Sequence, residues 1–193
     1  MNGGGLLLIR HAETDLAGSF CGSSNPAVNA AGERQIATLL ETLHTMPCEP
    51  LDIVYSSDLQ RALTTAQRVA DCFSAQLCIL PDLREIHLGE WEALTWQQIE
   101  QRDPIYAQQW LNVYPTRPAP GGEPVDRFEA RVLSTFDTLT SCNERAAIVT
   151  HAGVLRVILT RRSMMNDEEA WHQTSAYCSV FHYPLQEVVD DNG

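Results

Sequence analysis

The stretch LLLIRHAET, residues 6–14, places two polar side chains directly after a short apolar run. Leu6 to Ile9 follow three glycines and have the length and composition of a buried β-strand. Arg10 and His11 come next, so they would lie at the carboxyl end of that strand. In open α/β sheets ligands bind beyond the carboxyl ends of the strands, which makes this pair a candidate for a functional site.

A second segment repeats this arrangement in the later part of the chain. The apolar residues 146–149 are followed by Thr150 and His151. A single histidine after a strand is usually a structural residue, but two of them, with Arg10 beside the first, favour a site. If the two strands are neighbours in the sheet, His11 and His151 meet in one crevice.

Predicted strands and helices alternate along the rest of the chain. Further strands are predicted at residues 51–55, 77–80 and 176–183. Helices are predicted after Asn29, which can cap one, from Ser57 to Phe73, and at 95–110, 128–139 and 154–159. Residues 15–29 and 115–124 are rich in turn formers and are predicted loops. This alternation predicts a mostly parallel sheet covered on both faces, in a single α/β domain.

The charge composition excludes several classes of function. All 13 residues counted as Lys+Arg are arginines, so the chain has no lysine. A P-loop nucleotide site and a Schiff base both need a lysine. A net charge of −12, with no basic stripe, argues against a nucleic-acid partner and against binding to an anionic membrane. Any phosphate must be held by arginine, which can bind it through two hydrogen bonds at once.

Cysteine usage and the first residues indicate the compartment. The six cysteines contain no CxxC pair, and a chain of 193 residues does not need disulfides, so free thiols are expected. The segment MNGGGLLLIR lacks the features of a signal peptide. No apolar run approaches the roughly 18 residues of a membrane span. We therefore expect a cytoplasmic protein.

Arg61 adds a second cation to the predicted site. It lies in the first turn of the helix that follows the second strand, where the helix dipole favours anions rather than cations. An anion bound there would satisfy both the helix amides and the guanidinium. The alternative is a surface ion pair with Asp58.

Five motifs of the chain resemble those of the histidine phosphatase superfamily, the phosphoglycerate-mutase-like proteins. They occur in the order typical of the family and span residues 6 to 156: LLLIRHAET (6–14), VYSSDLQRALTTA (54–66), LREIHLGEWE (83–92), GGEP (121–124) and VTHAGVLR (149–156). The resemblance implies a three-layer α/β/α sandwich with a mostly parallel central sheet. It also implies one domain over residues 1–193 with a small cap or insertion around residues 86–122.

The resemblance implies a metal-independent phosphatase that needs no cofactor. His11 would attack phosphorus and become a phosphohistidine. Arg10, Arg61 and His151 would surround the phosphoryl oxygens. Glu85 would protonate the leaving alcohol and then deprotonate water. By composition alone Glu90 or Glu92 would serve equally well as the acid; only the motif selects Glu85.

Some positions near the predicted phosphate depart from the family pattern. The resemblance places Cys21, Gly22 and Ala152 beside the substrate. Alanine replaces the usual glycine at Ala12 and Ala152, and replaces a frequent asparagine at Ala17. Pro124 replaces a serine. Cys21 is either an oxidation-sensitive pocket thiol or an inert loop cysteine.

The substrate class follows from the segment after Glu85. Residues 86–120 contain only Arg102 and Arg117 as cations, which favours a phosphatase over a mutase that holds a bisphosphate. Residues 83–110, followed by PGGEP, resemble α-ribazole phosphatases of cobalamin biosynthesis, so α-ribazole 5′-phosphate is the leading substrate. The alternatives are a broad-specificity small-molecule phosphatase, a phosphoglycerate mutase, or a phosphoprotein-binding or phosphoprotein-directed module. Trp91 and Trp96 belong either to the core or to the substrate pocket. A homodimer remains open.

Overall fold

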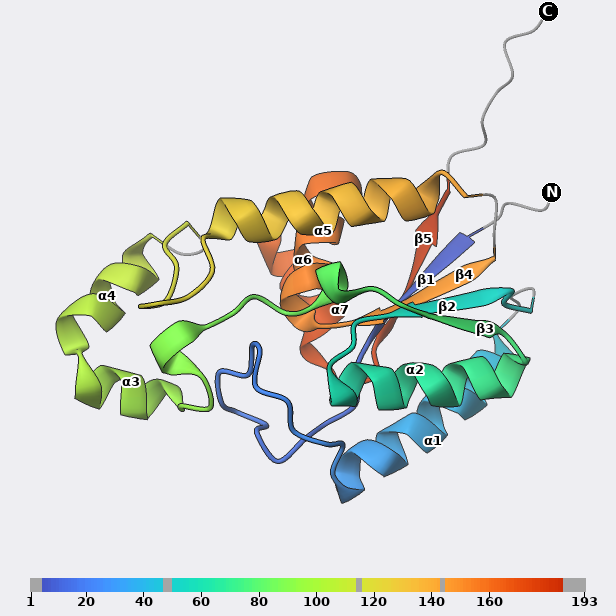
Figure 1. Cartoon of the computed structure of the whole chain (residues 1–193), viewed down its shortest axis with the longest axis horizontal. Helices are drawn as coiled ribbons and strands as arrows, with labels where there is room; N and C mark the ends of the chain where they lie inside the picture. The colour runs from blue at the N-terminus through green and yellow to red at the C-terminus, as the bar shows by residue number, and fades with distance from the viewer. Residues whose placement is uncertain (1–4, 47–49, 114–115, 143–144, 186–193) are drawn as a thin grey trace, which may run out of the picture.

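The computed structural model describes residues 5–46, 50–113, 116–142 and 145–185 (Figure 1). Within these ranges five strands form one sheet in the order β3-β2-β4-β1-β5. The first four strands are parallel to one another, and β5 runs antiparallel to β1 at the edge. Their bounds are β1 Gly5–Arg10, β2 Ile53–Ser56, β3 Gln76–Ile79, β4 Ala146–Thr150 and β5 Val180–Pro184. The predicted mostly parallel sheet is confirmed.

Helices cover both faces of the sheet and give three layers (Figure 1). One face packs against α1 (Ala30–Thr45) and α2 (Gln60–Phe73), through residues that include Leu39, Leu43, Ala66 and Val69. The other face packs against α5 (Val125–Thr140), α6 (Ala152–Arg162) and α7 (Asp167–Ser175), through residues that include Phe128, Val132, Phe136, Ile158 and Ala170. A strand buried on both faces must be apolar at successive positions, which explains the uninterrupted run of Leu6 to Ile9.

The pairing of β1 with β4 brings the two histidine segments together. In the parallel register Ile9 lies opposite Val149 and Arg10 lies opposite Thr150. The backbone N–H of His11 then donates to the carbonyl of Thr150 at 2.9 Å. Both histidines therefore follow neighbouring strands at the same edge of the sheet, which fulfils the condition under which the sequence predicts that they meet.

Several element boundaries differ from the prediction. The helix expected over residues 95–110 is two helices, α3 (Trp96–Arg102) and α4 (Pro104–Asn112), because Asp103 caps α4 and Pro104 cannot continue α3. The last strand begins at Val180 rather than at residue 176. Helix α7 was not predicted, and α2 begins at Gln60 rather than at Ser57.

Residues 86–122 have an apolar cluster of their own. Buried Trp91, Ile99, Ala107 and Ala119 form its centre, and Phe20, Trp96, Tyr106 and Trp110 pack around it. Figure 1 shows α3 and α4 beyond the end of the sheet, on the side of the strands' carboxyl ends. Two backbone hydrogen bonds of 2.8 Å tie Phe20 to Ala93 and Leu94, so the loop after β1 is joined to this segment. None of the helices in the described ranges has both the length and the apolarity that crossing a membrane requires.

Candidate active site

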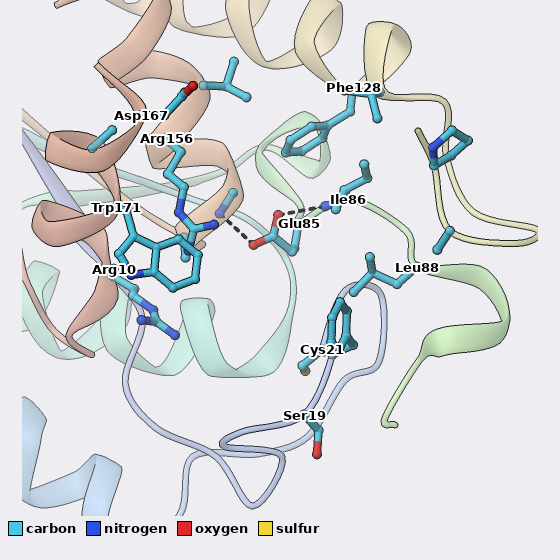
Figure 2. A pocket seen from close by; sticks show the side chains of 18 of the residues that line it. Arg10, Ser19, Cys21, Glu85, Ile86, Leu88, Phe128, Arg156, Asp167 and Trp171 are labelled. Carbon is cyan, nitrogen blue, oxygen red and sulfur yellow. Dashed lines mark hydrogen bonds between the residues drawn. The ribbon is translucent and has the colours of Figure 1, made fainter. Parts of the chain in front are cut away.

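A cavity of about 720 Å³ opens at the carboxyl ends of the strands, between the sheet and residues 86–122. Of the predicted site residues, Arg10, His11, Cys21, Glu85 and Ala152 line it. Figure 2 shows Arg10, Arg156 and Trp171 on one side of this cavity, Ile86, Leu88 and Phe128 on the other, and Glu85 between them. One wall is thus polar and cationic and the opposite wall is apolar.

His11 has its ring orientation and its tautomer fixed by one backbone group. Its Nδ1 lies 2.7 Å from the carbonyl oxygen of Ala12, which can only accept, so Nδ1 carries the hydrogen. Nε2 is then left with a lone pair, and it accepts a hydrogen bond from Nε of Arg61 at 3.2 Å. Burial, together with the charges of Arg61 and Arg10, lowers the pKa of His11 well below 6.5. The ring is therefore neutral, as a nitrogen nucleophile must be.

Arg61 lies completely buried behind His11 and does not line the cavity. Its Nη1 donates to the carbonyl of Ser24 at 2.6 Å. Its Nη2 donates to the carbonyls of Gly22 at 2.8 Å and Cys21 at 3.3 Å. The guanidinium is therefore held in a single orientation by the backbone of the loop. The alternative ion pair with Asp58 is wrong, because Asp58 accepts from Nε of Arg84 at 2.6 Å.

His151 is also completely buried, and its ring centroid lies 5.0 Å from that of His11. Its Nε2 lies 2.7 Å from the hydroxyl of Ser57. No group in the described part of the chain hydrogen-bonds to its Nδ1, which is buried as well. Burial lowers the pKa of His151 well below 6.5, and electrostatic interactions with His11, Arg61 and Arg10 lower it further. Buried polar atoms are rarely left without a partner, so Nδ1 is an atom that a ligand could satisfy.

Glu85 projects into the cavity with both oxygens hydrogen-bonded to backbone amides (Figure 2). Oε2 accepts from the N–H of Gly153 at 2.9 Å, in the first turn of α6, and Oε1 accepts from the N–H of Ile86 at 3.0 Å. Arg131 holds the backbone leading to Glu85 by donating to the carbonyls of Asp82, Arg84 and Glu85. Glu90 and Glu92 do not line the cavity.

Arg10 depends on the helix that the sequence did not predict. Its Nη1 donates to the carbonyl of Thr174 at 3.0 Å and also to that of Ser175, at the end of α7. The guanidinium carbon lies 4.0 Å from the ring centroid of Tyr177. Burial lowers the pKa of Arg10. Helix α7 therefore positions one of the candidate phosphate ligands.

Among the cavity residues that the sequence did not single out are Arg156, Trp171 and Tyr177. The guanidinium carbon of Arg156 lies 3.9 Å from the ring centroid of Trp171, and its Nε donates to the hydroxyl of Thr174 at 3.2 Å. Arg156 ends the motif VTHAGVLR, so a signal for it was present. Neither aromatic residue lies in a motif, and nothing in the sequence singles them out.

The remaining predicted positions lie in the backbone around the cavity or in the loop after β1. Gly22 acts through its backbone, since a β-carbon there would collide with the carbonyl of Ile86. Ala12 is fully buried, and its N–H donates to the hydroxyl of Thr65 at 3.0 Å. Burial raises the pKa of the Cys21 thiol, which favours an inert loop cysteine over a reactive one. Ala17 lies in a turn, donating to the carbonyl of Thr14 at 3.0 Å.

The two tryptophans that the sequence left open have different positions. Trp91 is 3% exposed and belongs to the apolar cluster of residues 86–122, whereas Trp96 is half-buried and lines the cavity. Among the described residues, no cluster of three or more His, Cys, Asp or Glu side chains is arranged to hold a metal ion.

The fold and this cavity define an α/β enzyme with a buried, neutral histidine facing an arginine at the carboxyl edge of its sheet. The family description "Histidine phosphatase superfamily (branch 1)" matches residues 6–187, so the chain belongs to this superfamily and is a phosphatase.

Relatives with phosphatase names match this chain over most of its length. A metal-independent phosphoserine phosphatase of Arabidopsis thaliana is 33% identical, with 97% of this chain and 79% of that protein covered. An adenosylcobalamin/alpha-ribazole phosphatase of Salmonella typhimurium is 32% identical, with 86% and 83% covered. The crystal structure of the alpha-ribazole phosphatase from Shigella flexneri superimposes with a TM-score of 0.76 at 30% identity, covering 87% of this chain and 84% of that one.

Proposed function

We propose that the chain hydrolyses small-molecule phosphate monoesters through a phosphohistidine formed on Nε2 of His11. The observation that carries this proposal is the state of that ring. The hydrogen on Nδ1 is fixed by the Ala12 carbonyl, so the lone pair lies on Nε2, next to the Arg61 guanidinium. An imidazole in this state can attack phosphorus without first losing a proton.

In the first step the Nε–H of Arg61 turns from Nε2 of His11 to a phosphoryl oxygen, which frees the lone pair of Nε2. Nε2 then attacks phosphorus, the N–P bond forms and the P–O bond to the alcohol breaks. Glu85 in its protonated form gives its proton to the leaving oxygen. In the second step the Glu85 carboxylate takes a proton from water, and the water oxygen attacks phosphorus. The N–P bond then breaks, which releases inorganic phosphate and restores the neutral ring.

Arg10, Arg61 and His151 stabilise the negative charge of the transferring phosphoryl group in this proposal. Arg61 supports this role because its Nε already lies 3.2 Å from the atom that phosphorus would join. His151 supports it through the buried Nδ1 that no described group satisfies. The two arginines would supply the positive charge that other phosphoryl-transfer enzymes obtain from a metal, and neutral His151 would add a hydrogen bond, so the proposed reaction is metal-independent.

Residues 86–122 form the substrate-covering cap in this proposal, within one domain. Their separate apolar cluster and their position over the cavity support this. The two arginines of the segment favour hydrolysis over mutase chemistry. Arg102 donates to Glu90 at 3.2 Å and does not line the cavity, whereas Arg117 lines the cavity and lies 4.1 Å over the ring of Tyr106, so the cap offers the substrate one arginine at most.

The leading substrate is α-ribazole 5′-phosphate, which would place the protein in cobalamin synthesis. The Salmonella relative and the Trp96 and Trp110 rings in the cavity lining support a flat aromatic base. The second candidate is a phosphorylated amino acid such as phosphoserine. The Arabidopsis relative supports it, and so does Arg156, a cation in the cavity suited to a carboxylate. The cysteines of the described residues are free, which supports a cytoplasmic location.

The mechanism is tested by replacing His11 with asparagine. His11→Asn should lower kcat for an aryl phosphate by about 10⁴-fold or more and should abolish an acid-labile, base-stable phosphoenzyme trapped during turnover. His172→Asn, at an exposed position on α7, is the control and should keep full activity. Normal turnover by His11→Asn would refute the phosphohistidine. Binding of a phosphopeptide without turnover by the unaltered protein would indicate a binding module instead.

Substrate choice is tested by comparing kcat/KM for four compounds: α-ribazole 5′-phosphate, O-phosphoserine, 3-phosphoglycerate and a simple sugar phosphate. A clear preference for the first supports the cobalamin role, and a preference for the second supports the amino-acid phosphatase. Similar values for all four would indicate broad specificity. Conversion of 3-phosphoglycerate into its isomer would indicate a mutase.

A further inference from the structure

We propose that Glu92 is a positioning residue for Arg61, acting through the backbone of residues 21–24. Its carboxylate holds one side of this loop, and the guanidinium of Arg61 is held by the other side. The inference rests on the proposed function, in which Arg61 acts on the phosphoryl group. It assigns a task to a carboxylate that lies outside the cavity and takes no part in the proton transfers.

The loop presents hydrogen-bond donors to the Glu92 carboxylate. Oε1 accepts from the N–H of Ser23 at 2.7 Å and from its hydroxyl at 3.1 Å. Oε2 accepts from the N–H of Ser24 at 3.0 Å, from its hydroxyl at 2.6 Å, and from the N–H of Gly22 at 3.2 Å. The N–H of Leu88 also donates to Oε1, at 3.0 Å. Three consecutive loop amides therefore point at one carboxylate.

The planarity of the peptide bond transmits this orientation to Arg61. In a trans peptide the N–H of one residue and the C=O of the residue before it point in opposite directions. The amides of Gly22 and Ser23 point at Glu92, so the carbonyls of Cys21 and Gly22 point away from it. Those are two of the three carbonyls that accept from Arg61, at 3.3 and 2.8 Å. Each of these two peptide planes thus joins the carboxylate to the guanidinium.

Two further features make this arrangement specific. Gly22 has no room for a side chain, because a β-carbon there would collide with the Ile86 carbonyl and with Oε1 of Glu92. Burial raises the pKa of Glu92, but hydrogen bonds from Ser24, Leu88 and Ser23 outweigh it and lower the pKa to about 2. Glu92 is therefore an anion under any ordinary assay condition and can accept all six hydrogen bonds.

Glu92→Gln is the first variant. Glutamine has nearly the size of glutamate, but its NH₂ group would face the N–H and O–H donors of the loop in place of an acceptor oxygen. We expect kcat to fall by about 10- to 100-fold, with KM changed much less, because the misplaced group is Arg61 and not the substrate pocket. Glu90→Gln is the matched control. It lies in the same short turn, its side chain is 59% exposed, and it pairs with Arg102, so kcat should stay within about two-fold of the unaltered enzyme.

A double-mutant cycle separates positioning from a general structural role. In an Arg61→Met background, Glu92→Gln should cost less than about two-fold, because no guanidinium remains to be misplaced. Ser24→Ala, which removes one hydroxyl donor, should show the same pattern with a smaller loss and serves if Glu92→Gln does not fold. Circular dichroism and Tm confirm which variants are folded.

The outcomes distinguish the two proposals. If Arg61→Met keeps full activity, the role of Arg61 in the proposed function is refuted. If Arg61→Met is impaired but the losses from Glu92→Gln or Ser24→Ala are the same in both backgrounds, the positioning role alone is overturned. Full activity of folded Glu92→Gln, or equal losses in Glu90→Gln, would also overturn it.

Discussion

The backbone amide of Gly153 donates to Oε2 of Glu85 at 2.9 Å, and the α-carbon of this glycine lies against the same carboxylate. A β-carbon at Gly153 would collide with Oε1 of Glu85. The sequence departs from the family pattern at the preceding position, Ala152, but keeps a glycine at this one. The second glycine position of the motif is therefore required by the carboxylate.

Gly153→Ala should displace the Glu85 carboxylate and lower kcat by about 10- to 100-fold, within the range typical of a general acid. The loss should be largest for substrates with a poor leaving group, such as an alkyl phosphate, and smallest for p-nitrophenyl phosphate. Steady-state rates with both substrates measure it. Equal loss with both leaving groups would contradict the explanation.

Ser57 determines which nitrogen of His151 carries the hydrogen. We infer that its O–H donates to Nε2 of His151 at 2.7 Å, because the hydroxyl hydrogen is buried and no other acceptor for it is present among the described residues, and the ring hydrogen of His151 then lies on Nδ1. Ser57→Ala should lower affinity for vanadate, a phosphate analogue, by about 10-fold, the value of one hydrogen bond to a charged group. Nitrogen NMR of His151 should show a mixture of tautomers.

The neighbouring Ser56 offers a matched control for this prediction. It is equally buried, and its hydroxyl donates to the carbonyl of Ser57 rather than to a histidine. Ser56→Ala should leave the His151 tautomer and the vanadate affinity unchanged. A single Nδ1–H tautomer in Ser57→Ala would contradict the role given to Ser57.

The two buried histidines should make the protein less stable in mild acid. Their folded-state pKa values are lowered below 6.5, so the unfolded chain binds more protons as pH falls. Their contribution to the free energy of unfolding is complete above about pH 6.5 and is lost as pH falls below it, by up to about 1.4 kcal/mol per pH unit for each histidine. Urea unfolding between pH 7.5 and 5 measures this slope.

His11→Asn and His151→Asn should each reduce the slope, whereas His172→Asn, which is exposed, should not. An unchanged slope in both site variants would show that other groups control stability in this range.

The cavity contains separate features for an aromatic base and for a carboxylate. Trp96→Ala should lower kcat/KM for α-ribazole 5′-phosphate by about 5- to 10-fold, the value of one aromatic contact, and leave O-phosphoserine almost unaffected. Arg156→Met should lower kcat/KM for O-phosphoserine by about 10-fold or more through loss of a charge-assisted hydrogen bond. If each variant changes both substrates equally, the two features are not separate subsites.

The strands and the histidine pair could be predicted because apolar runs such as Leu6 to Ile9 have no helical interpretation of comparable strength. Each histidine directly follows its strand, so a sheet with β1 beside β4 brings the two together. The strand order itself has no signal in a single sequence. His11, Glu85 and the two arginines followed largely from motif resemblance; the structure places His11, Glu85 and Arg10 in the lining of one cavity and Arg61 within hydrogen-bond distance of His11.

Contacts made by backbone groups were beyond the reach of the sequence. Arg10 is held by carbonyls at the end of α7, whose sequence DEEAWHQTS has too few apolar residues to show an amphipathic pattern; only Ala170 and Thr174 of this helix are buried. Arg61 is held by loop carbonyls, and Glu92 by loop amides, so side-chain identity reveals neither. By composition alone Glu92 was an alternative acid; the motif selected Glu85 instead, and only the folded loop shows what the Glu92 carboxylate contacts.

The central position of β4 has a consequence for how the protein acquires activity. β1 and β2 do not pair with each other; each pairs with β4, which lies between them. Before residue 146 has left the ribosome, a nascent chain already contains His11, Arg61 and Glu85, but it lacks the strand that joins β1 to β2. Pairings between such distant segments form slowly in folding. The rate at which hydrolysis recovers after dilution from denaturant should therefore report the rate at which β4 pairs with β1 and β2.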